Sequence, residues 1–253
     1  SGAETLLAIS SNGLSYYDYH PAYGQTYYYK VSAVTSFGES PLSNEFSIRG
    51  PTSPQPPTGL MVSASSASQI NLIWTAPSDS GTSPITAYKI ERSSDSGSTW
   101  STIQSNTAST STTYSDTGLA HSTTYTYRVS AINQVGTGQP SVTASATTFN
   151  VVPSPPIGLT AATQLLKINL SWNAPSDNGG TPITGYMVER STDNGNTWST
   201  IVSNTGSTGT TYSDKNVLPL TTYTYRVSAI NNMGTGSPSN TASASIASAP
   251  TLP

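Results

Sequence analysis

The chain of 253 residues is poor in charge: it has 9 Lys and Arg against 12 Asp and Glu, a net charge of −3. So few basic residues, with no run of Lys or Arg, exclude a phosphate-neutralising surface, and we expect no nucleic-acid partner. The absence of cysteine excludes disulfides, thiolate catalysis and sulfur-rich metal sites, and without a stretch of about 18 apolar residues we expect no membrane insertion.

Residues 1–49 correspond to the second half of a unit that occurs in full twice further along the chain. Tyr27, Tyr29 and Val31 alternate with other residues, which predicts a half-buried strand, and the same pattern returns 98 positions later at Tyr125. Ordering this segment costs on the order of 50–100 kcal/mol, which half a core does not offset, so we expect it not to fold alone. Two explanations stay open. The first half of the unit lies outside this sequence, or another chain supplies the missing strands in a head-to-tail polymer.

Two complete units follow, over residues 50–150 and 151–248, and they repeat with a period of 98 residues. Five landmarks recur at that spacing: Trp74 at Trp172, Pro84 at Pro182, Trp100 at Trp198, Tyr125 at Tyr223 and Gly136 at Gly234. Each unit begins after a proline-rich joint, and residues 249–253 predict the start of another linker. Because proline fixes φ and favours extended geometry, we expect these joints to be short, semi-rigid spacers.

Within each unit, apolar residues alternate with polar ones over short runs, as at Ile70, Leu72 and Trp74. Such alternation predicts half-buried β-strands. Turn residues such as Asp95-Ser96-Gly97 separate the runs, and no segment has a helical period. Several short strands in about 100 residues predict an antiparallel sandwich.

The unit resembles a fibronectin type III domain. The resemblance rests on a Pro-Pro-x-Gly-Leu opening, on a tryptophan followed closely by Ala-Pro, and on a Tyr-x-Tyr-x-Val-x-Ala strand, found at 56–60, 74–77 and 125–131 and again at 155–159, 172–175 and 223–229. It implies an all-β array of tandem immunoglobulin-like sandwiches, in which residues 1–49 supply strands C′ to G. It also implies that Tyr125 and Tyr223 form the tyrosine corner, with the ring buried and the hydroxyl bonded to nearby backbone.

One motif, Ser-x-Asp-x-Gly-x-Thr-Trp, occurs at 93–100 and again at 191–198. It matches the Asp-box of sialidase-like propellers, but its spacing is too long for a propeller blade of about 40–50 residues. We interpret it as a hairpin stabiliser in which Asp and Gly build the turn and Trp covers it. The residues that we expect to stabilise the fold are therefore Trp74, Trp172, Tyr125, Tyr223, Asp95, Trp100, Asp193 and Trp198.

No arrangement of side chains predicts chemistry. The acids recur in both units, mostly in turns, so we expect no pair of catalytic carboxylates and no enzyme activity. His20 and His121 lie in loops without metal-ligand spacing, so we expect no metal and no other cofactor. A calcium site at Asp79 or Asp177 stays open as an alternative. Asn169 begins the only N-glycosylation sequon.

These features predict a non-enzymatic structural or adhesive segment of an extracellular fibre or cell-surface protein. Its Ser- and Thr-rich, near-identical repeats are typical of prokaryotic arrays. We expect its partners to be other copies of itself or neighbouring modules of the same chain, with cell-surface or matrix glycans and proteins as further candidates. One finer hypothesis is head-to-tail polymerisation by strand complementation of the half domain. The alternatives are accessory spacer modules of a secreted polysaccharide-degrading enzyme and a ligand-binding receptor ectodomain, and the similar loops of the two units disfavour the receptor.

Overall fold

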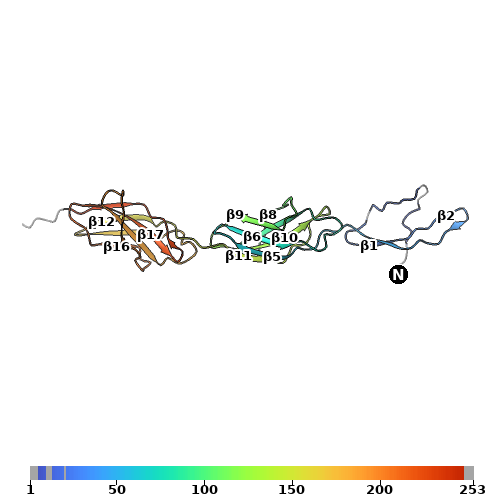
Figure 1. Cartoon of the computed structure of the whole chain (residues 1–253), viewed down its shortest axis with the longest axis horizontal. Helices are drawn as coiled ribbons and strands as arrows, with labels where there is room; N and C mark the ends of the chain where they lie inside the picture. Colours follow the sequence, from blue (N-terminus) through green and yellow to red (C-terminus); the bar gives the residue numbers. More distant parts are fainter. Residues whose placement is uncertain (1–4, 10–12, 20, 248–253) are drawn as a thin grey trace, which may run out of the picture. The chain divides into compact units, whose positions relative to one another are not determined.

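The computed structural model describes residues 5–9, 13–19 and 21–247, and in them it has strands and no helix (Figure 1). The all-β class implied by the resemblance is therefore confirmed. By density of contacts the chain divides into two compact units: Ser1–Met61 with Ile73–Tyr114 and Thr126–Ala144, and Val62–Leu72 with Ser115–Tyr125 and Ser145–Pro253. Below, the N-terminal segment is residues 1–49, the second repeat is 50–150 and the third repeat is 151–248.

In the N-terminal segment, β1 (Thr26–Tyr29) pairs antiparallel with β4 (Phe46–Arg49), and β2 (Val34–Thr35) pairs with β3 (Gly38–Glu39). The described residues before β1 form no strand, so the assignment of strands C′ and E to them stays a prediction. Val31 is 70% exposed, whereas Val129 and Val227, at the same position of the two complete units, are fully buried. The segment therefore presents apolar side chains that the complete units cover.

The second repeat has two sheets. One has the order β5-β6-β9, formed by Thr58–Ala64, Gln69–Thr75 and Thr113–Thr117. The other has the order β11-β10-β7-β8, formed by Ala144–Thr147, Thr124–Ile132, Ala87–Ser93 and Ser101–Gln104. Trp74 of β6 meets Tyr88 of β7 edge to face, with ring centroids 5.1 Å apart. An aromatic pair therefore joins one sheet to the other.

The third repeat repeats this arrangement. Its sheets have the orders β12-β13-β16 and β15-β14-β17-β18, with β19 also paired to β17. The strands are β12 (Ile157–Gln164), β13 (Lys167–Asn173), β14 (Gly185–Ser191), β15 (Ser199–Val202), β16 (Thr211–Asp214), β17 (Thr222–Asn231), β18 (Gly234–Thr235) and β19 (Ala242–Ser245).

The core of the third repeat follows the period-two pattern of its strands. Ile168, Leu170 and Trp172 alternate along β13 and are each at most 4% exposed. Tyr225 and Val227 of β17 belong to the same buried cluster. Because successive side chains of a strand point to opposite faces, the alternation places one apolar face of each sheet in the core.

Candidate functional site: the joint between the second and third repeats

The linker between the second and third repeats is bonded on both sides. The Phe149 N–H donates to the Ser66 carbonyl (3.3 Å), and the Phe149 carbonyl accepts from the Ser122 N–H (3.2 Å). Two residues later, the Val151 N–H donates to the Gly179 carbonyl (2.9 Å). A single residue, Asn150, therefore separates the bonds to the second repeat from the bonds to the third.

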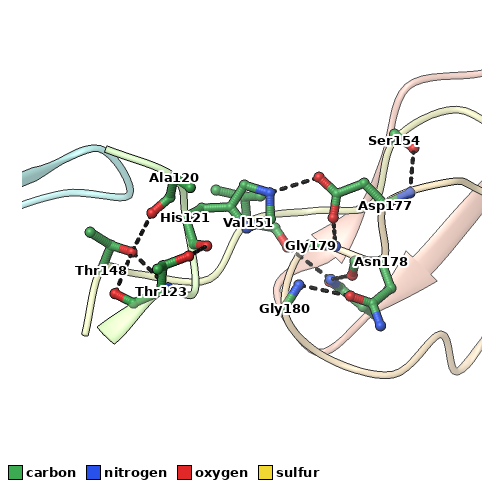
Figure 2. Close-up of polar contacts among 11 residues, drawn as sticks. Ala120, His121, Thr123, Thr148, Val151, Ser154, Asp177, Asn178, Gly179 and Gly180 are labelled. Atoms are coloured by element: carbon green, nitrogen blue, oxygen red, sulfur yellow. Dashed lines mark hydrogen bonds and ion pairs between the residues drawn. The ribbon is translucent and has the colours of Figure 1, made fainter. Parts of the chain in front are cut away.

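A side-chain pair also crosses this joint (Figure 2). His121, in the loop between β9 and β10, places Nε2 2.7 Å from Oδ2 of Asp177, in the loop between β13 and β14. The Gly179 N–H donates to Asp177 Oδ1 at 2.8 Å. Both contacts lower the pKa of Asp177 below its ordinary value of 3.8, and the bond from the Gly179 N–H has the larger effect. The side chains are 30% and 48% exposed, so solvent screens the pair and its net contribution is at most about 1 kcal/mol.

Two glycines allow the close approach at this joint. Gly179 and Gly180 have φ of 74° and 87°, in the region where side chains are rarely tolerated. A Cβ on Gly179 would overlap the Val151 carbonyl, and one on Gly180 would overlap the Ser122 side chain. The Asp177-Asn178-Gly179-Gly180 turn therefore fits against the linker and the preceding repeat because its last two residues have no side chain.

A buried asparagine fixes the linker to the third repeat. Asn231, at the end of β17, is 4% exposed. Its Nδ2 donates to the carbonyls of Val151 and Asn178, both at 2.8 Å, and its Oδ1 accepts from the Met233 N–H at 2.8 Å. One amide thus joins the linker, the turn after β13 and the turn after β17.

The joint before the second repeat has counterparts of the asparagine and of the acid. Asn133 Nδ2 donates to the carbonyls of Thr52 and Ser80, both at 2.9 Å. On the other side, the Gly24 N–H donates to the Pro51 carbonyl at 3.0 Å. Arg49 lies 3.7 Å from Asp79, which is the counterpart of Asp177. The two asparagines were not predicted from the sequence, although each follows Ala-Ile and precedes a glycine by three residues in both repeats.

The Asp-box turns lie on a different part of each repeat. Asp193 accepts hydrogen bonds from the Thr197 N–H (2.9 Å), the Ser191 hydroxyl (2.7 Å) and the Thr197 hydroxyl (2.7 Å). These donors lower the pKa of Asp193 to about 2, and the Thr197 N–H has the largest effect. The Arg226 guanidinium lies 4.3 Å from the centre of the Trp198 ring. The turn and its tryptophan are thus occupied with contacts inside the repeat.

The second repeat carries the same turn. Asp95 accepts from the Ser93 hydroxyl (2.6 Å) and from Thr99, and the Ser93 bond is the main cause of a pKa of about 2. Arg128 lies 4.2 Å from the centre of the Trp100 ring. Both copies of the motif therefore have one geometry.

Comparison with known proteins decides the family. The sequence model of the fibronectin type III domain matches residues 55–147 and 154–245, which together make up most of the chain. The chain belongs to the fibronectin type III family. The two matches correspond to the second and third repeats.

Relatives of this fibronectin type III chain are varied. It is 29% identical over 229 residues to Myomesin-2 of Homo sapiens, covering 86% of this chain and 15% of that protein. It is 32% identical over 193 residues to Exoglucanase B of Cellulomonas fimi, covering 72% of this chain and 16% of that protein. The solved structure of the chicken CNTN1 FN1–FN3 domains matches with a TM-score of 0.49 and 23% identity, over 79% of this chain and 69% of that one. The chain thus spans less than a fifth of the length of Myomesin-2 and of Exoglucanase B.

The aromatic residues predicted to stabilise each fibronectin type III repeat lie as follows. Trp74 and Trp172 are 3% and 4% exposed in the cores of their repeats. The hydroxyl of Tyr125 accepts from the Ala120 N–H at 3.2 Å, and that of Tyr223 accepts from the Leu218 N–H at 2.9 Å. Each tyrosine hydroxyl is therefore bonded to backbone five residues upstream.

The remaining candidates take part in local contacts. Asn169 lies on β13, where its amide donates to Gln164 (2.8 Å) and accepts from the Ser213 hydroxyl (2.7 Å). Asp214, one of the acids that recur in both repeats, is buried and accepts from the Tyr225 hydroxyl at 2.9 Å. His20 and residues 249–253 lie outside the described part of the chain.

Within residues 5–9, 13–19 and 21–247, no three His, Asp or Glu side chains gather closely enough to hold a metal ion. The same residues contain no helix long and apolar enough to cross a membrane. Modification of Asn169 and calcium binding at Asp79 or Asp177 stay predictions.

Proposed function

We propose that this chain is a stiff, non-enzymatic spacer: a structural or adhesive segment of an extracellular fibre or cell-surface protein. The observation that carries this proposal is the pair of anchors at Phe149 and Val151, on either side of Asn150. A flexible linker would have several residues free of contacts to either domain. Here the last linker residue that is bonded to the second repeat and the first that is bonded to the third are only two positions apart.

The joint contacts support stiffness by their number. The two bonds of Phe149 and the two of Val151 each stabilise by about 0.5–1.5 kcal/mol. These bonds leave only the backbone of Asn150 between the two repeats, and the His121–Asp177 pair, which adds little energy, crosses that residue. The first joint carries the same asparagine and turn, so the proposal extends to both linkers.

The proposed partners are neighbouring modules or other copies of the chain, with cell-surface or matrix glycans and proteins as further candidates. Val31, at 70% exposure, and Phe46 and Ile48 of β4, at 66% and 52%, favour a partner for the N-terminal segment. The finer form of the proposal is that strands of another chain cover this face, giving a head-to-tail polymer. Val31→Asp should then reduce the sedimentation coefficient of the material at micromolar concentration. An equal value for both proteins would contradict polymerisation and leave the spacer role intact.

A second candidate function is that of an accessory spacer in a secreted polysaccharide-degrading enzyme. The similarity to Exoglucanase B favours it, since that protein shares 32% identity over 193 residues with this chain. Both candidates use the stiff joint. They differ in the neighbouring domains, so the intact mass and a polysaccharide-hydrolysis assay of the full-length protein separate them.

The stiffness can be measured directly because the chain has no cysteine of its own. Exposed Thr117 and Ser199 are replaced by cysteine and spin-labelled, and the distance distribution between the labels is recorded by electron–electron double resonance. We expect a single narrow distribution. Gly180→Ala should broaden it, because the new Cβ would overlap Ser122.

A matched control separates this overlap from backbone strain. Gly206 also has a positive φ (62°), but a Cβ there would meet nothing within 4 Å. Gly206→Ala should therefore leave the distribution narrow. A broad distribution in the unmodified sequence, or equal effects of both substitutions, would contradict the stiff joint.

A further inference from the structure

Two neighbouring turns at one end of the third repeat carry exposed leucines. Leu165 and Leu166, between β12 and β13, are 90% and 59% exposed. Leu218 and Leu220, between β16 and β17, are 67% and 82% exposed. The two turns are adjacent because β13 pairs with β16, Ile168 lying opposite Asp214. Four large apolar side chains therefore face solvent together at this end.

The backbone of these turns makes the leucines more unusual. Leu165 and Leu220 have φ of 52° and 59°, in the left-handed region that large side chains rarely adopt. Leu165 is the first residue of a two-residue hairpin turn between Gln164 and Lys167, a position where a positive φ normally selects glycine. Leucine at these positions gains no burial within the repeat.

The equivalent end of the second repeat is already a joint. Ser122, 98 positions before Leu220, also has a positive φ (52°) and lies against Gly180 of the third repeat. The loop between β5 and β6, which corresponds to the Leu165 turn, provides the Ser66 carbonyl that holds Phe149. The first position therefore contacts the next repeat, and the second holds the linker that leads to it.

We propose that the exposed leucines of the third repeat form the docking face for the N-terminal end of a further fibronectin type III repeat. This inference rests on the proposed spacer function and adds a specific surface and partner to it. The third joint would then have apolar contacts from the leucines, where the second has the polar pair His121 and Asp177.

The charges at this end fit the same partner. Lys167 and Lys215 line one hollow with Leu165 and Leu166, and neither lysine forms an ion pair within the described ranges. In both complete repeats the N-terminal end carries an acid at one position, Asp79 or Asp177. An incoming repeat would bring that carboxylate to the end of the third repeat that carries the two lysines, with Pro219 in place of His121.

The test extends the chain after Pro253 with a second copy of residues 156–247, which keeps the linker as long as the one before the third repeat. Hydrogen exchange is then measured by mass spectrometry for peptides covering 164–167 and 217–221. We expect exchange there to slow by about tenfold or more relative to the original chain, the equivalent of about 1.4 kcal/mol. Leu165→Ser with Leu220→Ser should remove that protection, serine being the residue at position 122.

Controls keep every outcome decisive. The same double substitution in the original chain should leave the exchange of β14 and β17 unchanged, because the leucines are exposed there. A second extended chain, carrying residues 57–147 instead, covers the case in which the first added repeat fails to fold.

Unchanged exchange in both extended chains, or protection that survives the double substitution, would overturn the docking face. So would leucine-dependent binding of the original chain to vesicles of phosphatidylcholine and phosphatidylserine, since this would assign the leucines to a lipid surface. None of these results alters the label distances between positions 117 and 199, which test the spacer function separately.

Discussion

Replacing Asn231 with alanine should destabilise the third repeat and release its linker. The side chain is 4% exposed, and its amide makes three hydrogen bonds of 2.8 Å, to the Val151 and Asn178 carbonyls and from the Met233 N–H. Each such bond contributes about 0.5–1.5 kcal/mol, and a polar group left buried without a partner costs about 1–3 kcal/mol. Because the joint lies at the end of the sandwich, water can reach part of the freed backbone. We therefore expect a loss of about 2–4 kcal/mol in the free energy of unfolding.

Native-state hydrogen exchange gives this quantity for each repeat in one experiment. Amides of β17 report unfolding of the third repeat, and amides of β10 report unfolding of the second. Asn231→Ala should lower the β17 value alone, and Asn133→Ala, its counterpart, the β10 value alone. Asn231→Asp keeps the acceptor but turns an anion toward two carbonyls, so it should be at least as destabilising at neutral pH.

A change of less than about 1 kcal/mol in β17 would refute the reasoning, because it would mean that water replaces the amide at no cost. An equal fall in β10 would refute it differently, since the effect would then not be local to one linker.

Three further predictions concern the third repeat. Arg226→Lys should lower its free energy of unfolding in urea by about 1–2 kcal/mol, because lysine cannot keep both the two-point contact with Glu189 and the stacking on Trp198; an unchanged midpoint would contradict this. Tyr223→Phe should cost about 1 kcal/mol, since a backbone N–H of the corner loses its acceptor, and a neutral effect in thermal melting would argue against the corner. The pKa of Asp193, about 2, lies below the 3.8 of a free aspartate, so its contribution to stability is complete above about pH 4 and lost as the pH falls toward 2; an NMR titration with an ordinary midpoint would disprove it.

Much of the fold follows from local sequence pattern. The period of 98 residues delimits the repeats, and the alternation at Ile168, Leu170 and Trp172 predicts a strand with one buried face, which the structure contains. Such inferences succeed because the two faces of a strand are set by alternating positions in the sequence. They also succeed because two repeats of nearly identical sequence form the same core. The Pro-Pro-x-Gly-Leu opening, the tryptophan before Ala-Pro and the Tyr-x-Tyr-x-Val-x-Ala strand then carry the resemblance to the family.

The contacts at the joint between the second and third repeats, in contrast, depend on the tertiary structure. The Asn231 amide binds a carbonyl 80 residues upstream, and His121 meets Asp177 56 residues downstream. In sequence, each of these residues is typical of an ordinary turn, where Asn, Asp and Gly are expected for local reasons. Likewise, Leu165 and Leu220 are part of an unremarkable apolar content until the backbone places them at exposed turns with positive φ. Local chemistry thus determines each repeat, whereas the contact between repeats depends on which turn ends meet, and only the folded chain brings those ends together.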